Sequence, residues 1–344
     1  MDIAEFDYEL PPEAIAQEPL PERDASRLLV LDRQTGRLRH QRFCDLPELL
    51  EPGDLLVVNR SRVFPARLLG HRVGGGEAEI LLLRPLGEGC WEALVRPGRK
   101  LRPGHQVQVG AELTVRIESE AFGAEGRRRV SLLVAAEEEA AQIERAGHVP
   151  LPPYIRREDR PADRDRYQTV FARETGSVAA PTAGLHFTPD LLRRLEARGI
   201  QRVDILLHVG PGTFRPVKAV RVEDHRLEAE PYFIPAETAA ALAATRRRGR
   251  RVVAVGTTTT RALEASAARH GEVVPETADT DLVIVPGFRF RAVDAVVTNF
   301  HLPRSSLLLL VSAFAGREAV LAAYGDAIRA GYRFYSYGDA MLIL

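Results

Sequence analysis

The sequence predicts an α/β fold in two parts: a large α/β domain with a mostly parallel sheet, and a small all-β, barrel-like domain inserted into it. A length of 344 residues suits roughly two domains of about 150 residues each. Between residues 64 and 134, short apolar runs follow one another with turn residues and no helical pattern, whereas strand and helix patterns alternate after residue 188. We therefore expect residues 1–63 and 147–344 to form the large domain and residues 64–146 to form the insert.

The first strands of the large domain are expected at 28–31 and 54–58, where apolar runs are bounded by Asp, Gly and Pro. Pairs of glycine and proline separate the strands of the insert, as is typical of a small barrel or sandwich. A short helix follows and ends at Gly147, ahead of the proline-rich segment 150–153. The expected elements of the insert include strands at 78–83, 91–95, 113–117 and 129–134 and a helix at 137–146.

The alternating part of the chain begins at Thr188, because a threonine followed by proline and an acid is typical of a helix start. Gly199 ends that helix. Alternation of strands with helices favours parallel strands covered by helices. The expected strands are 203–209, 251–255, 281–285 and 295–298, and the expected helices are 236–248, 260–270 and 305–314.

Charge and cysteine content exclude several classes of protein. The 47 basic and 47 acidic residues give zero formal net charge, so bulk electrostatics predicts neither a nucleic-acid nor a membrane partner. Cys44 and Cys90 have no metal-ligand spacing, and we expect neither a metal site nor a disulfide. The N-terminus has no apolar leader, and the longest apolar stretch, 307–315, is about half a membrane span. These features predict a soluble, cytoplasmic protein without a membrane segment.

Four polar clusters follow predicted strands or precede predicted helices: 179–187, 208–214, 256–260 and 299–303. Because ligands bind beyond the carboxyl ends of parallel strands, we expect the clusters to meet in one pocket. Each cluster also has a plainer interpretation, since a threonine run can cap a helix and a loop histidine can be structural. Four of the nine histidines lie in or near these clusters: His186, His208, His225 and His301.

Common nucleotide and hydrolase motifs are absent from the sequence. Neither a P-loop nor a strand followed by G-x-G-x-x-G occurs, which disfavours a conventional dehydrogenase or methyltransferase. There is no G-x-S-x-G elbow of a hydrolase. The arginines of segment 156–166 alternate with acids and predict a solvated surface, whereas Arg246, Arg247 and Arg248 have no acid among them and are the better candidates for phosphate contacts.

The polar clusters belong to longer strings: 179–187, 207–210 with 212–214, 255–258 with Arg261, 298–303, 337–341, 59–63 with 65–67, and 147–155. These strings closely resemble the S-adenosylmethionine:tRNA ribosyltransferase-isomerase family, which makes epoxyqueuosine in tRNA. The resemblance covers essentially the whole chain, and the insert is its least distinctive part. It implies a large α/β domain with a small all-β domain, in agreement with the division above.

The resemblance implies an enzyme that moves the ribosyl part of S-adenosylmethionine onto the aminomethyl group of a 7-deazaguanine base at the tRNA wobble position, with release of adenine and methionine. We expect a monomer with tRNA as partner, S-adenosylmethionine as cosubstrate and no prosthetic group. The candidate residues are, for catalysis, His186, His208, His301 and Glu230; for substrate binding, Thr182, Gly184, Phe187, Gly210, Thr213, Thr257, Thr258, Arg261, Asn299, Tyr337 and Asp339; and for tRNA binding, Arg62, Arg67, Arg246, Arg247 and Arg248.

The implied reaction needs a group that moves protons near neutral pH. The sulfonium acidifies the neighbouring ribose carbon, so a base can remove a proton and start the loss of adenine; attack by the amine and ring closure to the epoxide then expel methionine. Histidine suits this task. His186 is the first candidate, because a helix start beside it favours the neutral imidazole, and His208 and His301 come next.

Two positions depart from the family pattern. Where members commonly have His-x-Met-His-x-Glu, this chain has 225–230 with Glu228 in place of the second histidine, and Arg60 stands where a short side chain is usual. Two other functions remain open at this point: an S-adenosylmethionine-dependent RNA methyltransferase, and a non-catalytic RNA-binding protein built on the insert.

Overall fold

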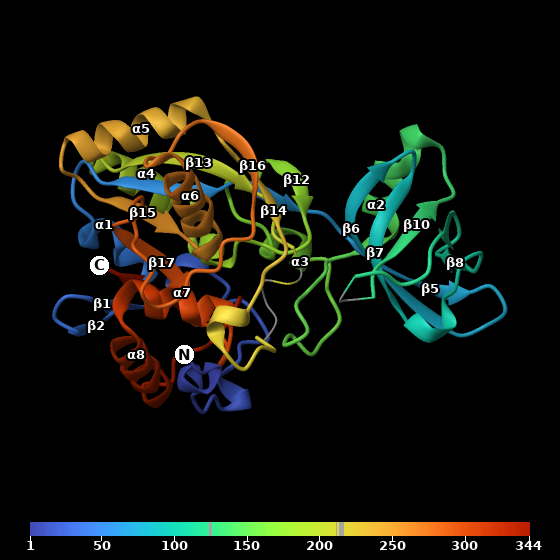
Figure 1. Cartoon of the computed structure of the whole chain (residues 1–344), viewed down its shortest axis with the longest axis horizontal. Helices are drawn as coiled ribbons and strands as arrows, with labels where there is room; N and C mark the ends of the chain where they lie inside the picture. Colours follow the sequence, from blue (N-terminus) through green and yellow to red (C-terminus); the bar gives the residue numbers. More distant parts are fainter. Residues whose placement is uncertain (124–125, 211, 213–216) are drawn as a thin grey trace.

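A computed structural model of the chain describes residues 1–123, 126–210, 212 and 217–344. Thr213, a candidate substrate-binding residue, lies outside the described residues. Figure 1 shows an α/β domain that holds both termini and a separate β-barrel joined to it. The predicted fold class is confirmed.

A nine-stranded sheet forms the centre of the large domain, in the order β16-β14-β13-β3-β15-β17-β18-β1-β2. The neighbours β13, β3, β15 and β17 are parallel, as are β18 and β1, but the other pairs are antiparallel, so the sheet is mixed rather than mostly parallel. The strands are β1 Arg27–Leu31, β2 Leu38–Arg42, β3 Leu55–Asn59, β13 Gln201–Leu207, β14 Glu230–Ile234, β15 Val252–Val255, β16 Glu276–Thr280, β17 Ala295–Asn299 and β18 Ala340–Ile343.

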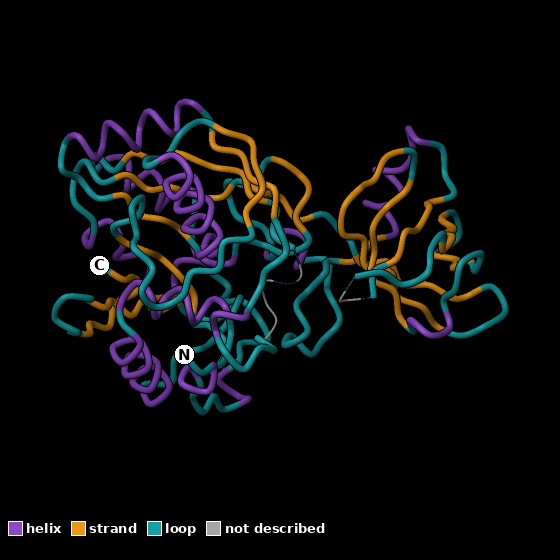
Figure 2. Tube along the Cα trace, in the orientation of Figure 1, coloured by secondary structure: helices purple, strands orange, loops and turns teal. Residues whose placement is uncertain are grey.

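Helices cover both faces of this sheet (Figure 2). Successive residues of β3 point to opposite faces: Leu55 and Val57 pack in the core that includes α5 to α8, whereas Leu56 and Val58 pack with α1 and α4. Every residue of β3 is buried, as expected for a strand between two helical layers. The helices are α1 Leu46–Leu49, α3 Asp163–Arg166, α4 Pro189–Ala197, α5 Ala236–Arg247, α6 Thr257–His270, α7 Ser306–Ala315 and α8 Arg317–Arg329.

The insert is a closed antiparallel barrel. β5 pairs with both β6 and β8, which closes the ring β5-β6-β7-β10-β9-β8 and leaves no open edge. β11 pairs with β5, so the barrel's sheet extends two residues past the expected boundary at residue 146. The elements are β5 Arg67–Arg72, β6 Glu77–Gly87, β7 Cys90–Arg96, β8 Gln106–Val109, β9 Leu113–Ile117, β10 Arg128–Leu132, α2 Glu139–Ala146 and β11 Gly147–His148.

A two-stranded parallel sheet lies between the domains. β4 Ser61–Val63 follows β3 directly and pairs with β12 Glu174–Ser177. Its register pairs Ser177 with Val63, which places β12 beside the end of β3. This small sheet brings segment 174–177 against the carboxyl edge of the large sheet.

Two expectations about secondary structure were wrong. Residues 281–285 form no strand. The strand lies just before them instead, since β16 Glu276–Thr280 pairs with β14. α6 begins at Thr257 instead of residue 260, so the threonine run forms its first turn. Among the described residues no single helix is long and apolar enough to cross a membrane, although α7 and α8, bent by 113°, pass that test as a pair.

Candidate functional site

The carboxyl ends of the parallel strands carry the predicted polar clusters on one edge of the sheet. His208 follows β13, Thr257 follows β15, and Asn299 ends β17. With neighbouring strands about 4.8 Å apart, the three steps from β13 to β17 span about 14 Å. Segment 179–187 also reaches this edge, since Thr182 Oγ1 donates to Asn299 Oδ1 at 2.8 Å.

Both ring nitrogens of His186 have hydrogen-bond partners. Its Nδ1 contacts Ser26 Oγ at 2.8 Å, and its Nε2 contacts Asn299 Nδ2 at 3.1 Å. The side chain is only 4% exposed and stacks on Phe43. Burial first, and then the charges of Arg333 and Arg23, lower the pKa of His186 to about 3. Such an imidazole stays neutral, but both of its nitrogens are occupied.

His301 is equally buried. Thr298 Oγ1 contacts its Nε2 at 2.7 Å, and the hydroxyls of Tyr324 and Tyr8 bind its backbone. Burial lowers the pKa of His301 to about 3. His301 lines a cavity of about 20 Å³ with Asn299, enough for about one water molecule. This space does not admit a substrate in the conformation described.

His208 differs from both, because it is partly exposed. Its Nδ1 lies 3.1 Å from Ser61 Oγ, which in turn contacts Ser177 Oγ, and Ser177 Oγ accepts a hydrogen bond from Val209 N at 2.9 Å. Nε2 of His208 has no hydrogen-bond partner among the described residues. A Cβ at Gly176 would lie 2.4 Å from Cε1 of this ring, so the glycine is what lets the ring lie there. Burial lowers the pKa of His208, with Glu174 acting in the opposite direction.

Glu230 and Arg261 form a buried ion pair beside the end of β13. The guanidinium of Arg261 also donates to Leu282 O at 3.0 Å and Thr280 O at 3.4 Å. The second oxygen of Glu230 accepts from Gly210 N at 2.9 Å. The pair therefore holds Gly210 in place, and the main contacts of Arg261 are internal.

The remaining candidates of segment 179–187 have packing roles. Phe187 is completely buried and packs edge-on against Phe43, so it offers no face to a ligand. A Cβ at Gly184 would lie 2.7 Å from Phe171 Cζ, which explains the glycine.

Thr257 and Thr258 are also buried, each 6% exposed, in the first turn of α6. Thr258 Oγ1 has no hydrogen-bond partner. It is the one candidate substrate-binding residue among those described whose buried hydroxyl lacks a partner.

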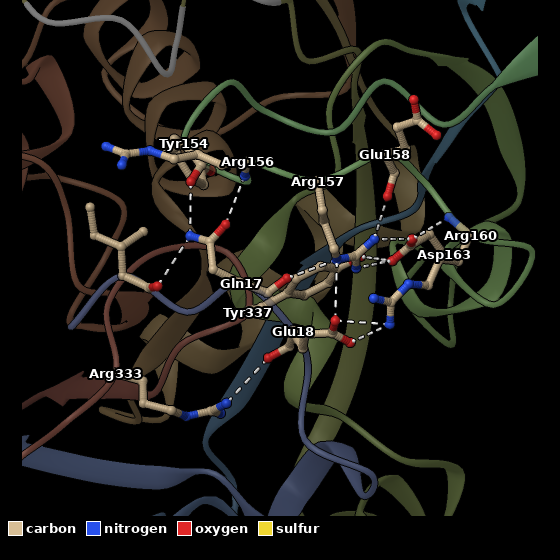
Figure 3. Close-up of polar contacts among 11 residues, drawn as sticks. Gln17, Glu18, Tyr154, Arg156, Arg157, Glu158, Arg160, Asp163, Arg333 and Tyr337 are labelled. Atoms are coloured by element: carbon tan, nitrogen blue, oxygen red, sulfur yellow. Dashed lines mark hydrogen bonds and ion pairs between the residues drawn. The ribbon is translucent and has the colours of Figure 1, made fainter. Parts of the chain in front are cut away.

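Tyr337 belongs to a polar network that connects the N-terminal segment, 154–163 and 333–337 (Figure 3). Its hydroxyl donates to Asp163 Oδ1 at 2.8 Å, and both oxygens of Asp163 bind Arg157. The hydrogen bond to Asp163 raises the pKa of Arg157, and the pKa of Asp163 is lowered because its hydrogen bonds, first of all from Arg157, outweigh the opposite effect of burial. Asp339 accepts from the backbone of Arg27 and Arg333, which makes it a structural residue.

A cleft of about 570 Å³ lies between the barrel and the large domain. This volume is in the range of small-molecule and nucleotide pockets. Val178 N binds Val209 O at 3.1 Å, so the wall of the cleft is attached to the residue after His208. Apolar side chains, four arginines and two acids line it: Leu81, Leu94, Val95, Pro150, Pro152, Ile155, Val178, Arg67, Arg96, Arg156, Arg157, Glu79 and Glu158.

The predicted tRNA-binding arginines fall into two separate places. Arg67 lines the interdomain cleft and pairs with Glu79 at 3.1 Å, and Arg62 is exposed on β4. Arg246, Arg247 and Arg248 end α5 and precede β15, so they lie at the opposite edge of the sheet from His208. The length of β15 alone places the two edges of the sheet about 13 Å apart. The structure does not bring this cluster together with the candidate site.

Glu228, where the family commonly has histidine, contacts the other domain. Its carboxylate pairs with Arg127 of the barrel, which also binds Glu92. His225 is half-buried, and burial lowers its pKa. The departure therefore coincides with an ion pair between the domains.

Within the described part of the chain, no group of three or more His, Cys, Asp and Glu side chains could hold a metal ion. The sequence reasoning overlooked Ser26, Ser61 and Ser177. Ser61 lies within the string 59–63, of which only Arg62 is among the candidate residues. No sequence signal pointed to Ser26, because its contact with His186 joins residues 160 positions apart.

A mixed α/β sheet with polar groups along one edge, joined to a barrel across a cleft, defines a two-domain enzyme of the α/β class. The model of the queuosine biosynthesis protein family matches residues 3–343. The chain belongs to this family.

Relatives named S-adenosylmethionine:tRNA ribosyltransferase-isomerase match over the full length. The protein of Moorella thermoacetica is 54% identical, with 100% of both chains covered, and that of Anaeromyxobacter sp. is 55% identical, with 100% of this chain and 99% of the relative covered. A crystal structure of S-adenosylmethionine tRNA ribosyltransferase from Thermotoga maritima aligns with a TM-score of 0.57 at 43% identity, covering 99% of this chain and 100% of that one. The protein is thus similar throughout to transferases of this kind.

Proposed function

We propose that the protein transfers the ribosyl part of S-adenosylmethionine to the aminomethyl group of a 7-deazaguanine base at the tRNA wobble position, and isomerises it to the epoxide of epoxyqueuosine. The names of its full-length relatives support this activity. No prosthetic group is needed, because the sulfonium of the cosubstrate itself activates the ribose. The proposal includes a monomeric, cytoplasmic protein; sedimentation tests the oligomeric state and cell fractionation the location.

The observation that carries the mechanism is the partly exposed imidazole of His208 at the strand edge. With Nδ1–H directed to Ser61 Oγ, Nε2 has the lone pair that accepts a proton from the ribose carbon next to the sulfonium. A lowered pKa keeps the ring neutral at pH 7, in the form that accepts. His186 and His301 are the other candidates; both are buried, and both ring nitrogens of His186 have partners, which favours a positioning role for these two histidines.

We further propose that the tRNA enters through the interdomain cleft. A base in the anticodon loop must leave its stack to meet a small cosubstrate inside a protein. The apolar walls of the cleft suit the face of a base, and Arg96 and Arg156 are exposed and have no ion-pair partner among the described residues.

Product analysis tests the function. Purified protein is incubated with S-adenosylmethionine and tRNA that carries the aminomethyl base, and the small products are separated. Adenine and methionine in equal amounts, formed only with this tRNA, are the expected result. S-adenosylhomocysteine would instead indicate a methyltransferase, and tRNA binding without either product would indicate a non-catalytic RNA-binding protein.

A further inference from the structure

The first turn of α6 presents donors without acceptors at the candidate site. Its N-cap is Gly256, with φ of 89° and no side chain to cap the helix. The N–H groups of Thr257, Thr258 and Thr259 have no acceptor among the described residues, whereas Thr260 N binds Gly256 O. The N-terminus of a 14-residue helix with free N–H groups attracts negative charge.

The hydroxyl of Thr258 adds a second, independent observation. In a helix, threonine usually donates to the carbonyl four residues earlier, and Thr259 and Thr260 do so, to Val255 O and Gly256 O. Thr258 makes no such bond to the carbonyl of Ala254. The residue is only 6% exposed, and its buried Oγ1 has no hydrogen-bond partner.

This hydroxyl is directed toward the end of the helix. Helical side chains lean toward the N-terminus. A Cβ built on Gly256 would lie 3.7 Å from Thr258 Oγ1 and 3.7 Å from Ala183 Cβ. The glycine therefore keeps open the space that Thr258, the helix terminus and segment 179–187 share, next to Thr182 and its partner Asn299.

We propose that the N-terminus of α6 and the Thr258 hydroxyl bind the carboxylate of the methionyl group of S-adenosylmethionine. The proposal rests on the proposed function and specifies how that site holds its cosubstrate. A carboxylate fits because it is compact and accepts several hydrogen bonds at once, from N–H groups and a hydroxyl. A phosphate of the tRNA backbone fits less well, because the turn is buried within the α/β domain and Arg261, one turn along the helix, is already paired with Glu230.

The test compares S-adenosylmethionine with its decarboxylated form, S-adenosylmethioninamine, by calorimetric titration. Wild-type protein is expected to bind the carboxylate form more tightly. Thr258→Val removes the hydroxyl and keeps the shape; it is expected to reduce this preference about tenfold, the scale of a hydrogen bond to a charged group. Thr259→Val is the matched control, since the Thr259 hydroxyl binds the backbone, and its preference is expected to stay as in wild type.

Thr258→Ala removes the same hydroxyl with less branching, and serves if the valine variant does not fold; Thr258→Ser keeps the hydroxyl and is expected to retain the preference. If a folded Thr258→Val or Thr258→Ala protein keeps the wild-type preference, whether both affinities stay the same or both fall equally, the carboxylate site is overturned. Either result leaves the proposed function intact if adenine and methionine are still released. Wild-type protein that binds neither ligand and releases no adenine would refute the function and, with it, this site.

Discussion

The side-chain amide of Asn299 donates to Nε2 of His186, with 3.1 Å between the nitrogens. The same amide nitrogen donates to Tyr335 O at 3.2 Å, which fixes its orientation because a carbonyl only accepts. Nε2 of His186 must therefore accept, and its proton lies on Nδ1, directed to Ser26 Oγ. Protonation of this ring would place two donors face to face, in addition to the cost of burial.

This relationship predicts a pH dependence of stability. His186 and His301 have a pKa of about 3 in the fold, against 6.5 ordinarily. Between those values they bind a proton only when unfolded, so stability is full above pH 6.5 and falls as the pH is lowered toward 3. His186→Gln is expected to reduce the slope of unfolding free energy against pH by about one proton, or about 1.4 kcal/mol per pH unit, between pH 4 and 6. Urea unfolding at several pH values measures it.

The variant is expected to be less stable than wild type at pH 7, because Asn299 and Ser26 lose a buried partner. The slope is independent of that loss. A slope equal to that of wild type would mean that His186 is protonated normally in the fold.

Replacement of His208 is expected to affect chemistry. His208→Gln should lower single-turnover ribosyl transfer at least about a hundredfold, the scale of a lost general base, while S-adenosylmethionine affinity stays within about tenfold. His40→Gln is the control, since His40 is exposed on β2, where it contacts Tyr332 and Asp326. Normal single-turnover rates in His208→Gln would exclude it as the base.

Ser61 is expected to act through His208. Ser61→Ala removes the oxygen that accepts from Nδ1 of the protonated ring, so the imidazolium is less favoured and the pKa of His208 falls further. The acidic limb of the rate profile should move to lower pH, and kcat should fall about tenfold with KM for S-adenosylmethionine unchanged. Rates measured from pH 5 to 8 decide this. A loss of stability with an unmoved limb would mean that Ser61 only packs between β4 and β12.

Local chemistry made much of the fold predictable. Thr188 caps α4 as expected, by accepting from Leu191 N. The secondary-structure and strand-direction predictions failed where the pairing of segments distant in the sequence determines which residues form a strand. Residues 281–285 have a strand-like composition, but β14 pairs with 276–280 instead. β18 pairs with β17 in the antiparallel direction, which makes the sheet mixed.

The strand-edge position of the candidate site was also predictable, whereas the hydrogen-bond partners of its histidines were not. His186 has the most distinctive surrounding string, yet Ser26 and Asn299, from distant parts of the chain, occupy both of its nitrogens. Likewise, Ser61 and Ser177 meet through the pairing of β4 with β12, which no local pattern indicates. Composition showed the arginines of 246–248 as a cluster, and only the topology places them at the other edge.

The route of the tRNA gives the last prediction. If the anticodon loop enters the interdomain cleft, Arg96 and Arg156 contact phosphates, and each contact contributes about 0.7 to 0.9 to the slope of log affinity against log salt. Arg96→Ala with Arg156→Ala should weaken binding in low salt and reduce that slope by about 1.5. Arg246→Ala, Arg247→Ala and Arg248→Ala together should leave the slope unchanged, although composition favours them, because they lie at the far edge of the sheet. Filter binding at 50 to 200 mM salt compares the two variants, both of which alter exposed side chains and should fold as wild type. A reduced slope in the triple variant alone would place the tRNA against α5 and away from the cleft.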